Sequence, residues 1–266
     1  NKRIAERMHP FVDEHYIRSE SDELLNAKTK VIDKDMKLSV FVRDLPLLKP
    51  AIKGGADIII FGGDILRGFD MDYAEAVSIC KENGVEIYIA APRIIRREFD
   101  AVMNKIYDAL HIEGEIYGGI YADNLGTVKY AIDHSIPYAA GFALNIFNRV
   151  SAKLFNDSGS SFISLSQELS VKDIEKIAPY FKDCEALCYG RIEMMVSEYC
   201  PVSSLSQNCG KDSGSPICMN KDIKLTDRMN MKFPVRTDIY CRSHIFNSRL
   251  LSMIDNLKDL ADAGIN

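Results

Sequence analysis

Four of the seven cysteines of this chain fall within one polar stretch, residues 200–241. They are Cys200, Cys209, Cys218 and Cys241, and their spacing is C-x8-C-x8-C-x22-C. The loop that holds the middle pair is rich in Ser, Asn, Gly and Lys, so it buries little apolar surface and cannot hold a shape by packing alone. Four thiolates that converge on a metal centre would fix such a loop, because ligation adds folding free energy. We therefore predict that this cysteine quartet binds a metal centre.

The other three cysteines suit a different role. Free cysteine often behaves as a small buried hydrophobe, and Cys80, Cys184 and Cys188 lie in apolar, periodic segments. The same interpretation fits Cys209 and Cys218 poorly, because the sequence NCGKDSGSPIC has almost nothing to bury. We expect the three apolar cysteines to lie apart from the quartet.

The ligand type alone does not identify the metal, because four thiolates can bind either zinc or an iron–sulfur cluster. Zinc sites favour closely paired cysteines, and none of the intervals in the quartet is C-x2-C. The spacing therefore favours iron–sulfur, with zinc as the alternative.

The charge of the chain limits how it could bind nucleic acid. With a net charge of −5, the chain cannot rely on overall charge to attract a phosphate backbone. Any contact with RNA must come from a local patch, and Arg93, Arg96 and Arg97 cluster after one expected strand. A solvated helix start is the alternative explanation of this cluster, and we slightly favour it.

Neither a membrane span nor a secretory signal is visible. The apolar runs are far shorter than the roughly 20 residues that cross a bilayer, and the N-terminal sequence NKRIAERMHPF is charged. We therefore expect a cytoplasmic location without membrane contact. In that reducing compartment, cysteine clusters more often bind metal than form disulfides.

The chain divides into a polar start and a long periodic part. Residues 1–35 are weakly periodic, and we expect a linker or approach segment there. From residue 36 to 266, helical patterns at 72–84, 99–110, 170–177 and 248–264 alternate with short apolar runs. The runs are bounded by Gly, Asp, Asn or Pro, as buried parallel strands usually are; they read LSVFV, DIIIFGG, EIYIAAP, GGIYADN, YAAGFALNIF, SFISLS and ALCYGRI.

This alternation predicts an α/β fold with a parallel sheet. Seven runs and an eighth strand expected at residues 238–243 give the eight units of a (β/α)8 TIM-like barrel over residues 36–266. The cysteine-rich segment 200–241 then follows strand seven as a loop. An open, doubly wound sheet is the alternative, but it calls for a Gly-rich phosphate loop after its first strand, and RDLPLLKPAIKGG is not such a loop.

The carboxyl ends of the strands form the active-site face of such a barrel. Arg93, Glu168 and Arg191 lie within or beside these ends, where an unpaired charge is costly, so they are the candidate catalytic residues. Structural ion pairs are the alternative. The other polar residues at these ends are Arg43, Asp44, Asp64, Asp123, Asn124, Asn145, Asn148, Gln167 and Glu193. For the Asn and Asp residues among them, turns and helix caps are the explanation that we favour.

Hydrolytic signatures are missing from the sequence. It has no HExxH and no G-x-S-x-G motif, and its five histidines are scattered. His244 follows Cys241 by three residues, so it is a candidate to contact the ligands of the predicted metal centre.

Several motifs resemble the peptidase U32 family, whose members were historically described as collagenase-like proteases. They are YGRIEMMVSEYCP, LSQELS, LNIFN, DRMNMKFPV and CRSHIFNS. The resemblance covers residues 36–266 and is greatest to the C-terminal part of the long members, in which a second barrel-like unit follows an inserted domain. It implies that the rest of a longer U32 polypeptide is a partner of this chain, which we expect not to turn over substrate alone.

The resemblance also implies a cofactor and an activity. Family members that hydroxylate RNA, in association with prephenate, or that act in oxygen-independent ubiquinone synthesis carry a [4Fe-4S] cluster on four cysteines. Carried over by motif, Cys200, Cys209, Cys218 and Cys241 are the ligands, and Arg191 lies beside the cluster. We therefore expect an iron–sulfur protein that takes part in hydroxylating an RNA base or a similar planar substrate. A collagenase-like peptidase and a non-catalytic barrel with structural zinc are the alternatives.

Two positions depart from the short family members. Those members carry an H-G-A-L-C type motif where this chain has Tyr189, Gly190 and Arg191, a difference that other cluster-bearing members share. They also have a Pro-Ala-Gly turn after the first strand, where this chain reads RDLP from Arg43. The second departure leaves two interpretations open, that this barrel is the catalytic unit or that it is a derived companion of one.

Overall fold

The computed structural model describes residues 36–66, 70–181, 183–205, 209, 218 and 222–266. The polar segment predicted over residues 1–35 lies outside the described residues. Within the described ranges, no helix is long and apolar enough to cross a membrane.

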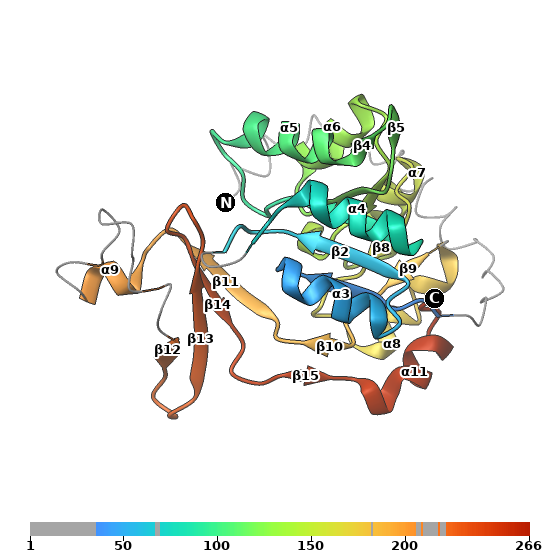
Figure 1. The fold of residues 1–266 in the computed structure, drawn as a ribbon. Helices are drawn as coiled ribbons and strands as arrows, with labels where there is room; N and C mark the ends of the chain where they lie inside the picture. Colours follow the sequence, from blue (N-terminus) through green and yellow to red (C-terminus); the bar gives the residue numbers. More distant parts are fainter. Residues whose placement is uncertain (1–35, 67–69, 182, 206–208, 210–217, 219–221) are drawn as a thin grey trace, which may run out of the picture.

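A parallel sheet forms the centre of the fold, as the sequence predicts (Figure 1). Its seven strands in the described part of the chain pair in sequence order. They are β1 (Ser39–Val42), β2 (Ile58–Gly62), β3 (Glu86–Ala90), β6 (Gly119–Ala122), β7 (Tyr138–Ala140), β8 (Ile163–Ser164) and β9 (Cys184–Glu185).

Helices follow most of these strands. They are α3 (Leu45–Lys53), α4 (Tyr73–Asn83), α5 (Phe99–Leu110), α6 (Leu125–Asp133), α7 (Arg149–Asp157) and α8 (Val171–Ile174), with short 3-10 turns η2 (Phe142–Leu144) and η3 (Ala178–Tyr180). The small hairpin β4 (His111–Ile112) and β5 (Glu115–Ile116) leads into β6. Helix α4 begins and ends as the sequence predicts. The Asp72 carboxylate accepts the Glu75 N–H over 3.0 Å at its start, and Gly84 ends it in the left-handed conformation.

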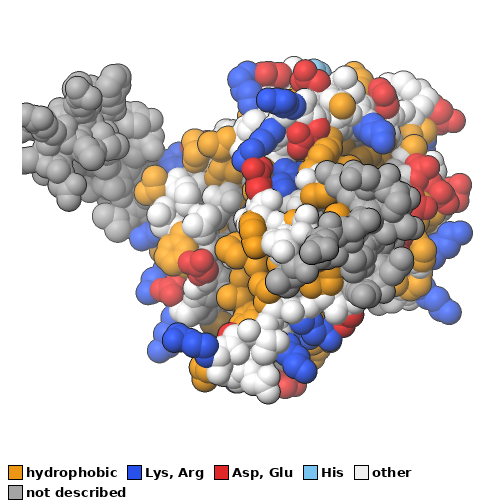
Figure 2. Space-filling view, turned by 90° about the vertical axis from the view of Figure 1, so that its left-hand side faces the viewer, with side chains coloured by type: hydrophobic (Ala, Val, Ile, Leu, Met, Phe, Trp, Pro, Cys, Tyr) orange, Lys and Arg blue, Asp and Glu red, His pale blue; other side chains and the backbone are white. Residues whose placement is uncertain are grey.

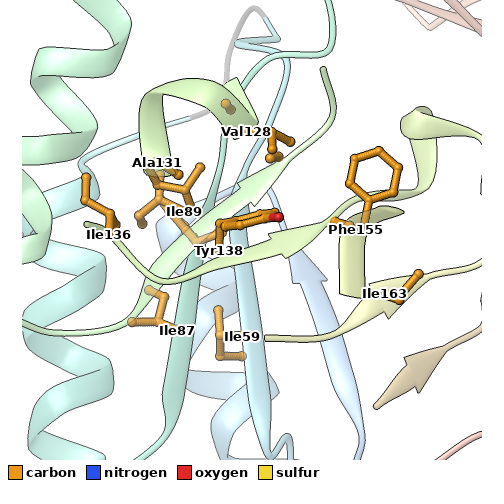
Figure 3. Packing of buried hydrophobic residues seen from close by; sticks show 14 of the residues in the cluster. Ile59, Ile87, Ile89, Val128, Ala131, Ile136, Tyr138, Phe155 and Ile163 are labelled. Carbon is orange, nitrogen blue, oxygen red and sulfur yellow. The ribbon is translucent and has the colours of Figure 1, made fainter. Parts of the chain in front are cut away.

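Both faces of the parallel sheet are buried. Successive side chains of a strand point to opposite sides of the sheet, so each strand contributes to both faces. Ile59, Ile87 and Ile89 face the helices and pack with Val128, Ala131 and other buried residues in the larger core cluster (Figure 3). The alternate positions Ile58, Ile60, Tyr88 and Tyr121 form a separate cluster on the inner face. The sheet also curls, since Glu185 on the last strand hydrogen-bonds Ser39 on the first.

A second, antiparallel sheet lies beside the parallel one (Figure 1). It pairs β11 (Glu193–Ser197), β14 (Ser243–Phe246), β13 (Lys232–Thr237) and β12 (Ile223–Thr226), and the helix α9 (Pro201–Leu205) follows β11. On the face seen in Figure 2, hydrophobic side chains are exposed between charged ones. The exposed large apolar residues of this sheet include Met194, Met195 and Leu225.

The prediction of an eighth barrel strand at residues 238–243 is wrong. Residues 238–242 form a turn instead, because the Asp238 carboxylate accepts the N–H groups of both Tyr240 and Arg242. The chain becomes extended again at Ser243, where β14 joins the antiparallel sheet. Among the described strands, β1 and β9 are therefore the two edges of the parallel sheet, which is a curled, open part of a TIM-like barrel.

Two further boundaries differ from the prediction. The seventh strand ends at Glu185, and Tyr189–Gly190 form a separate strand, β10. The last helix does not begin at Ser248, because β15 (Leu251–Ser252) pairs with β10. Helical structure starts at η4 (Ile254–Asn256) and continues in α11 (Leu257–Asp262).

Candidate functional site

Four cysteines of the segment 200–241 border one pocket. Cys200, Cys209, Cys218 and Cys241 all border a pocket of about 370 Å³. All seven cysteines fall among the described residues, where none of them forms a disulfide. The other three lie outside this pocket: Cys80 and Cys184 are buried, and Cys188 is half-buried.

Local structure fixes two of these cysteines. Cys241 lies in the turn that Asp238 closes, and its backbone has a φ of 65°, a left-handed conformation that costs most residues about 1–2 kcal/mol. Cys200 precedes α9, and its Sγ atom accepts the N–H of Ser203 over 3.5 Å.

The thiols are not grouped as ligands of a single ion. In the described part of the chain, the one group of three metal-ligating side chains with atoms within 4.8 Å of one another is Asp64, Glu193 and His244. A tetrahedral zinc with Zn–S bonds of about 2.3 Å would hold its sulfur atoms about 3.8 Å apart. Although the four cysteines of the quartet border one pocket, no three of their sulfur atoms lie within 4.8 Å of one another.

A network of buried charged groups connects residues of the two sheets. The imidazole of His244 is fully buried, and its Nδ1 atom lies 3.0 Å from Glu193 Oε2 and 3.6 Å from Asp64 Oδ2. Its Nε2 atom lies 3.6 Å from Asp238 Oδ2. The guanidinium of Arg93 reaches Glu193 Oε1 over 3.3 Å. The network thus joins the loop after β2, strands β11 and β14, and the turn that holds the last cysteine of the quartet.

Burial and charge act in opposite directions on the imidazole. Burial alone would lower the pKa of His244, but the carboxylates of Asp238, Glu193 and Asp64 raise it to about 9. The pKa of Asp64 is raised, chiefly by burial, although the positive charge of His244 acts against this. The pKa of Asp238 is lowered despite its burial, because His244 and Arg242 stabilise the carboxylate. The Arg242 Nε atom donates to Asp238 Oδ2 over 2.6 Å.

A second, larger cavity of about 1170 Å³ lies on the inner face of the parallel sheet. Its walls combine apolar and aromatic side chains with a few polar groups, as small-molecule sites do. The aromatic residues of the wall are Phe41, Tyr88, Tyr121, Phe142, Phe162, Tyr189 and Phe246. Arg43, Gln167, Glu185, Arg191 and Glu193 are among its polar residues.

Two acids at the ends of parallel strands, Glu185 on β9 and Asp123 after β6, have raised pKa values. Burial raises the pKa of Glu185 to about 7, although hydrogen bonds from Ser39 and Ser164 act against this. Burial also raises the pKa of Asp123 to about 7, against the hydrogen bond that the N–H of Ala143 donates to it over 3.0 Å. Both side chains can therefore donate or accept a proton near neutral pH.

The structure does not bring the three candidate catalytic residues together. Arg93 is part of the buried network through Glu193. Arg191 lines the large cavity rather than the cysteine pocket, and its Nη1 atom donates to the carbonyl oxygens of Asn247 and Ser248. Glu168 is exposed, so the argument that its charge would be costly does not apply. Of the predicted basic cluster, Arg96 borders the cysteine pocket and pairs with Glu198 over 2.7 Å.

The sequence analysis identified Asp64, Glu193 and His244 one by one, but it did not predict that they form a group. Asp64 was expected to serve a turn or a cap, Glu193 was named only as a polar residue at a strand end, and His244 was expected to accompany the quartet. Their sequence separation hides the grouping, since Asp64 and His244 are 180 positions apart. For Asp64 the available signal was its position at the carboxyl end of an apolar run. Glu193 lies in the antiparallel sheet, which the sequence did not indicate.

Comparisons with known proteins agree with the resemblance seen in the sequence. Residues 43–266 match the sequence profile of Peptidase family U32. A search of curated proteins finds none that matches the chain. The solved structure of the U32 peptidase Mk0906 is 10% identical, with a TM-score of 0.51 over 78% of this chain and 90% of that one, so the two share a fold.

A similarity to the spore cortex-lytic enzyme SleL of Bacillus cereus supports no inference. It has a TM-score of 0.38 at 7% identity, and it covers 90% of this chain and 70% of that one. The profile match, in contrast, spans most of the chain, from the end of β1 to the C-terminal residue. The chain therefore belongs to peptidase family U32.

Proposed function

We propose that this chain is the cluster-bearing unit of an iron–sulfur U32 protein, which takes part in hydroxylating an RNA base or a comparable planar substrate within a longer polypeptide. The observation that carries the proposal is the shared pocket of Cys200, Cys209, Cys218 and Cys241. Four cysteines from one polar segment have no packing role that would explain their convergence.

The donor set fits a [4Fe-4S] cluster, which is held by four cysteine thiolates. The spacing of the sulfur atoms supports a cofactor larger than a single zinc ion, because no three ligating atoms of the described cysteines fall within 4.8 Å. When bound, the cluster would supply one-electron transfer. The turn at Asp238 would hold Cys241 in position for it, and the Ser203 N–H, which donates to Cys200 Sγ, would orient that side chain.

The large cavity is the proposed substrate site. Its aromatic walls suit a flat ring, and Arg191 is the candidate catalytic residue that borders it. We assign Arg191 to substrate contact and Arg93 to positioning Glu193, which also borders the cavity. Glu168 is exposed, so we assign it no part in the cavity and propose only that it contacts the rest of the polypeptide or RNA.

The metal is tested first. Protein purified without oxygen should be brown and should contain about four irons and four sulfides per chain. Each of the four Cys→Ser substitutions in the quartet should lower both contents. Cys188→Ser is the matched control, since this half-buried thiol lies outside the pocket. A colourless anaerobic preparation with stoichiometric zinc would support the zinc-bearing module instead.

The reaction is tested in the longer polypeptide. We expect hydroxylated RNA after incubation with a reductant, RNA and prephenate, and no product from the 266-residue chain by itself. Gelatin serves as the competing substrate. Robust gelatin cleavage that persists after all four quartet cysteines are replaced by serine would contradict the proposal and support a collagenase-like peptidase.

A further inference from the structure

We propose a second metal site in this chain, for a single divalent cation, formed by Asp64, Glu193 and His244. One ligating atom from each residue lies within 4.8 Å of the others. None of the three residues borders the cysteine pocket. Glu193 borders the large cavity, which gives an ion a route to the site.

The two sheets position these ligands. Asp64 follows β2 at the carboxyl edge of the parallel sheet, while Glu193 and His244 come from the paired strands β11 and β14. The β11–β14 register shifts between Glu193 and Met195. A bulge of this kind re-aims a side chain, and here the Glu193 carboxylate reaches the imidazole of His244 over 3.0 Å.

The surroundings of His244 are those of a metal-binding imidazole. Such a histidine usually directs its other ring nitrogen to a carboxylate, which fixes the tautomer and the ring orientation. Asp238 Oδ2 lies 3.6 Å from Nε2, and Arg242 in turn holds Asp238 over 2.6 Å. In the metal-free chain the Nδ1 proton is directed at Glu193. A cation that replaced this proton would leave the other one on Nε2, directed at Asp238.

A buried polar atom without a hydrogen-bond partner gives an independent reason to expect a ligand. The Glu193 side chain is 4% exposed, and its Oε1 atom has no hydrogen-bond partner within the described residues. Unsatisfied buried groups are rare and costly. A cation would satisfy this oxygen atom, which the contact with Arg93 at 3.3 Å does only in part.

The ligand set indicates the class of metal. Two carboxylates and one imidazole suit Mn²⁺, Fe²⁺ or Zn²⁺, whereas thiolates select softer metals and clusters. Mn²⁺ therefore distinguishes this site from the cysteine quartet, and it is the probe we choose.

The test is a titration of the chelator-treated 266-residue chain with Mn²⁺, in which the free ion is counted by electron paramagnetic resonance. We expect one bound Mn²⁺ per chain. Asp64→Asn and Glu193→Gln should each weaken binding at least tenfold. Glu185→Gln, which removes another cavity-facing acid, and Cys200→Ser, which removes a quartet thiol, should leave binding unchanged.

Absence of Mn²⁺ binding by the wild-type chain overturns the site, and so does binding that resists both triad substitutions or is lost equally in Cys200→Ser. Circular dichroism checks that each variant is folded. If a triad variant does not fold, the wild-type complex decides the matter: nitrogen coupling from a bound imidazole in the pulsed Mn²⁺ spectrum supports the site, and its absence overturns it.

Discussion

The N–H of Cys241 donates to the carbonyl oxygen of Asp238 over 3.0 Å, inside a turn that the Asp238 side chain also closes. Cys241 has a positive φ of 65° there, which costs a non-glycine residue about 1–2 kcal/mol. Strain of this kind persists where the surroundings fix the backbone and the side chain has a task. The proposed ligand role supplies such a task.

In the metal-free chain, Cys241→Gly should be more stable than Cys241→Ala by about 1 kcal/mol. Both substitutions remove the sulfur, but only glycine relieves the left-handed backbone. Urea unfolding of the two variants measures the difference. Equal midpoints would mean that the turn imposes no strain on this residue.

Arg93 and Arg96 form a matched pair of ion pairs with the β11 region. The Arg93 contact with Glu193 is largely buried, whereas Arg96 and Glu198 are both well exposed. Arg93→Gln should cost about 2 kcal/mol, because it leaves the buried Oε1 atom of Glu193 without its cationic partner, although His244 still contacts Oε2. Arg96→Gln should cost less than about 1 kcal/mol, because solvent screens the exposed pair. Similar losses of stability for the two variants in thermal unfolding would contradict this assignment of burial.

Two glycines with nearly the same backbone conformation should respond differently to alanine. Gly114 and Gly118 have φ values of 86° and 85°. A Cβ atom at Gly114 would meet nothing within 4 Å, whereas at Gly118 it would lie 2.2 Å from the carbonyl oxygen of Ile87 on β3. Gly114→Ala should cost about 1–2 kcal/mol from the backbone alone. Gly118→Ala should cost clearly more, because β6 must move away from β3, and a chemical denaturation series would show the two losses as equal if that contact were absent.

Glu185 should make the protein less stable as the pH rises. Its pKa is raised by burial from an ordinary 4.5 to about 7, so between these values the unfolded chain loses a proton that the folded chain keeps. The free energy of unfolding therefore falls across this window and levels off above it. Glu185→Gln should remove a decrease on the order of 3 kcal/mol.

Asp123 contributes a decrease of the same sign, since its pKa is also raised to about 7. The Glu185→Gln variant should therefore keep part of the slope. Urea midpoints at about pH 5 and about pH 8 provide the measurement. An unchanged slope would show that the Glu185 carboxyl ionises normally in the folded chain.

Short-range signals made the parallel part of the fold predictable. Asp72 and Gly84 mark the ends of α4, and the apolar runs fall on the strands of the main sheet. The hairpin of β12 and β13 was missed because the polar segment 200–241 was interpreted as one loop. A tight turn from Asp227 to Met231, with Asn230 at a φ of 62°, joins its strands.

The remaining errors arise from contacts between distant residues. The turn at Asp238 replaced an eighth strand because its carboxylate serves Arg242 and His244, which no local pattern reveals. Leu251 became part of a strand rather than a helix because Gly190 lies opposite it. The exposed position of Glu168 likewise depends on how the chain turns after β8, which its sequence neighbours do not determine.

The open edge between β1 and β9 has a consequence for what the sheet encloses. In a closed eight-stranded barrel, side chains fill the interior completely. Here the parallel sheet has seven described strands, and its inward-facing residues, which pack in a small cluster of their own, also line about 1170 Å³ of space. With seven described strands instead of eight, the sheet therefore leaves space for a ligand where a closed barrel has a packed core. The side chains that would fill such a core are then able to contact that ligand.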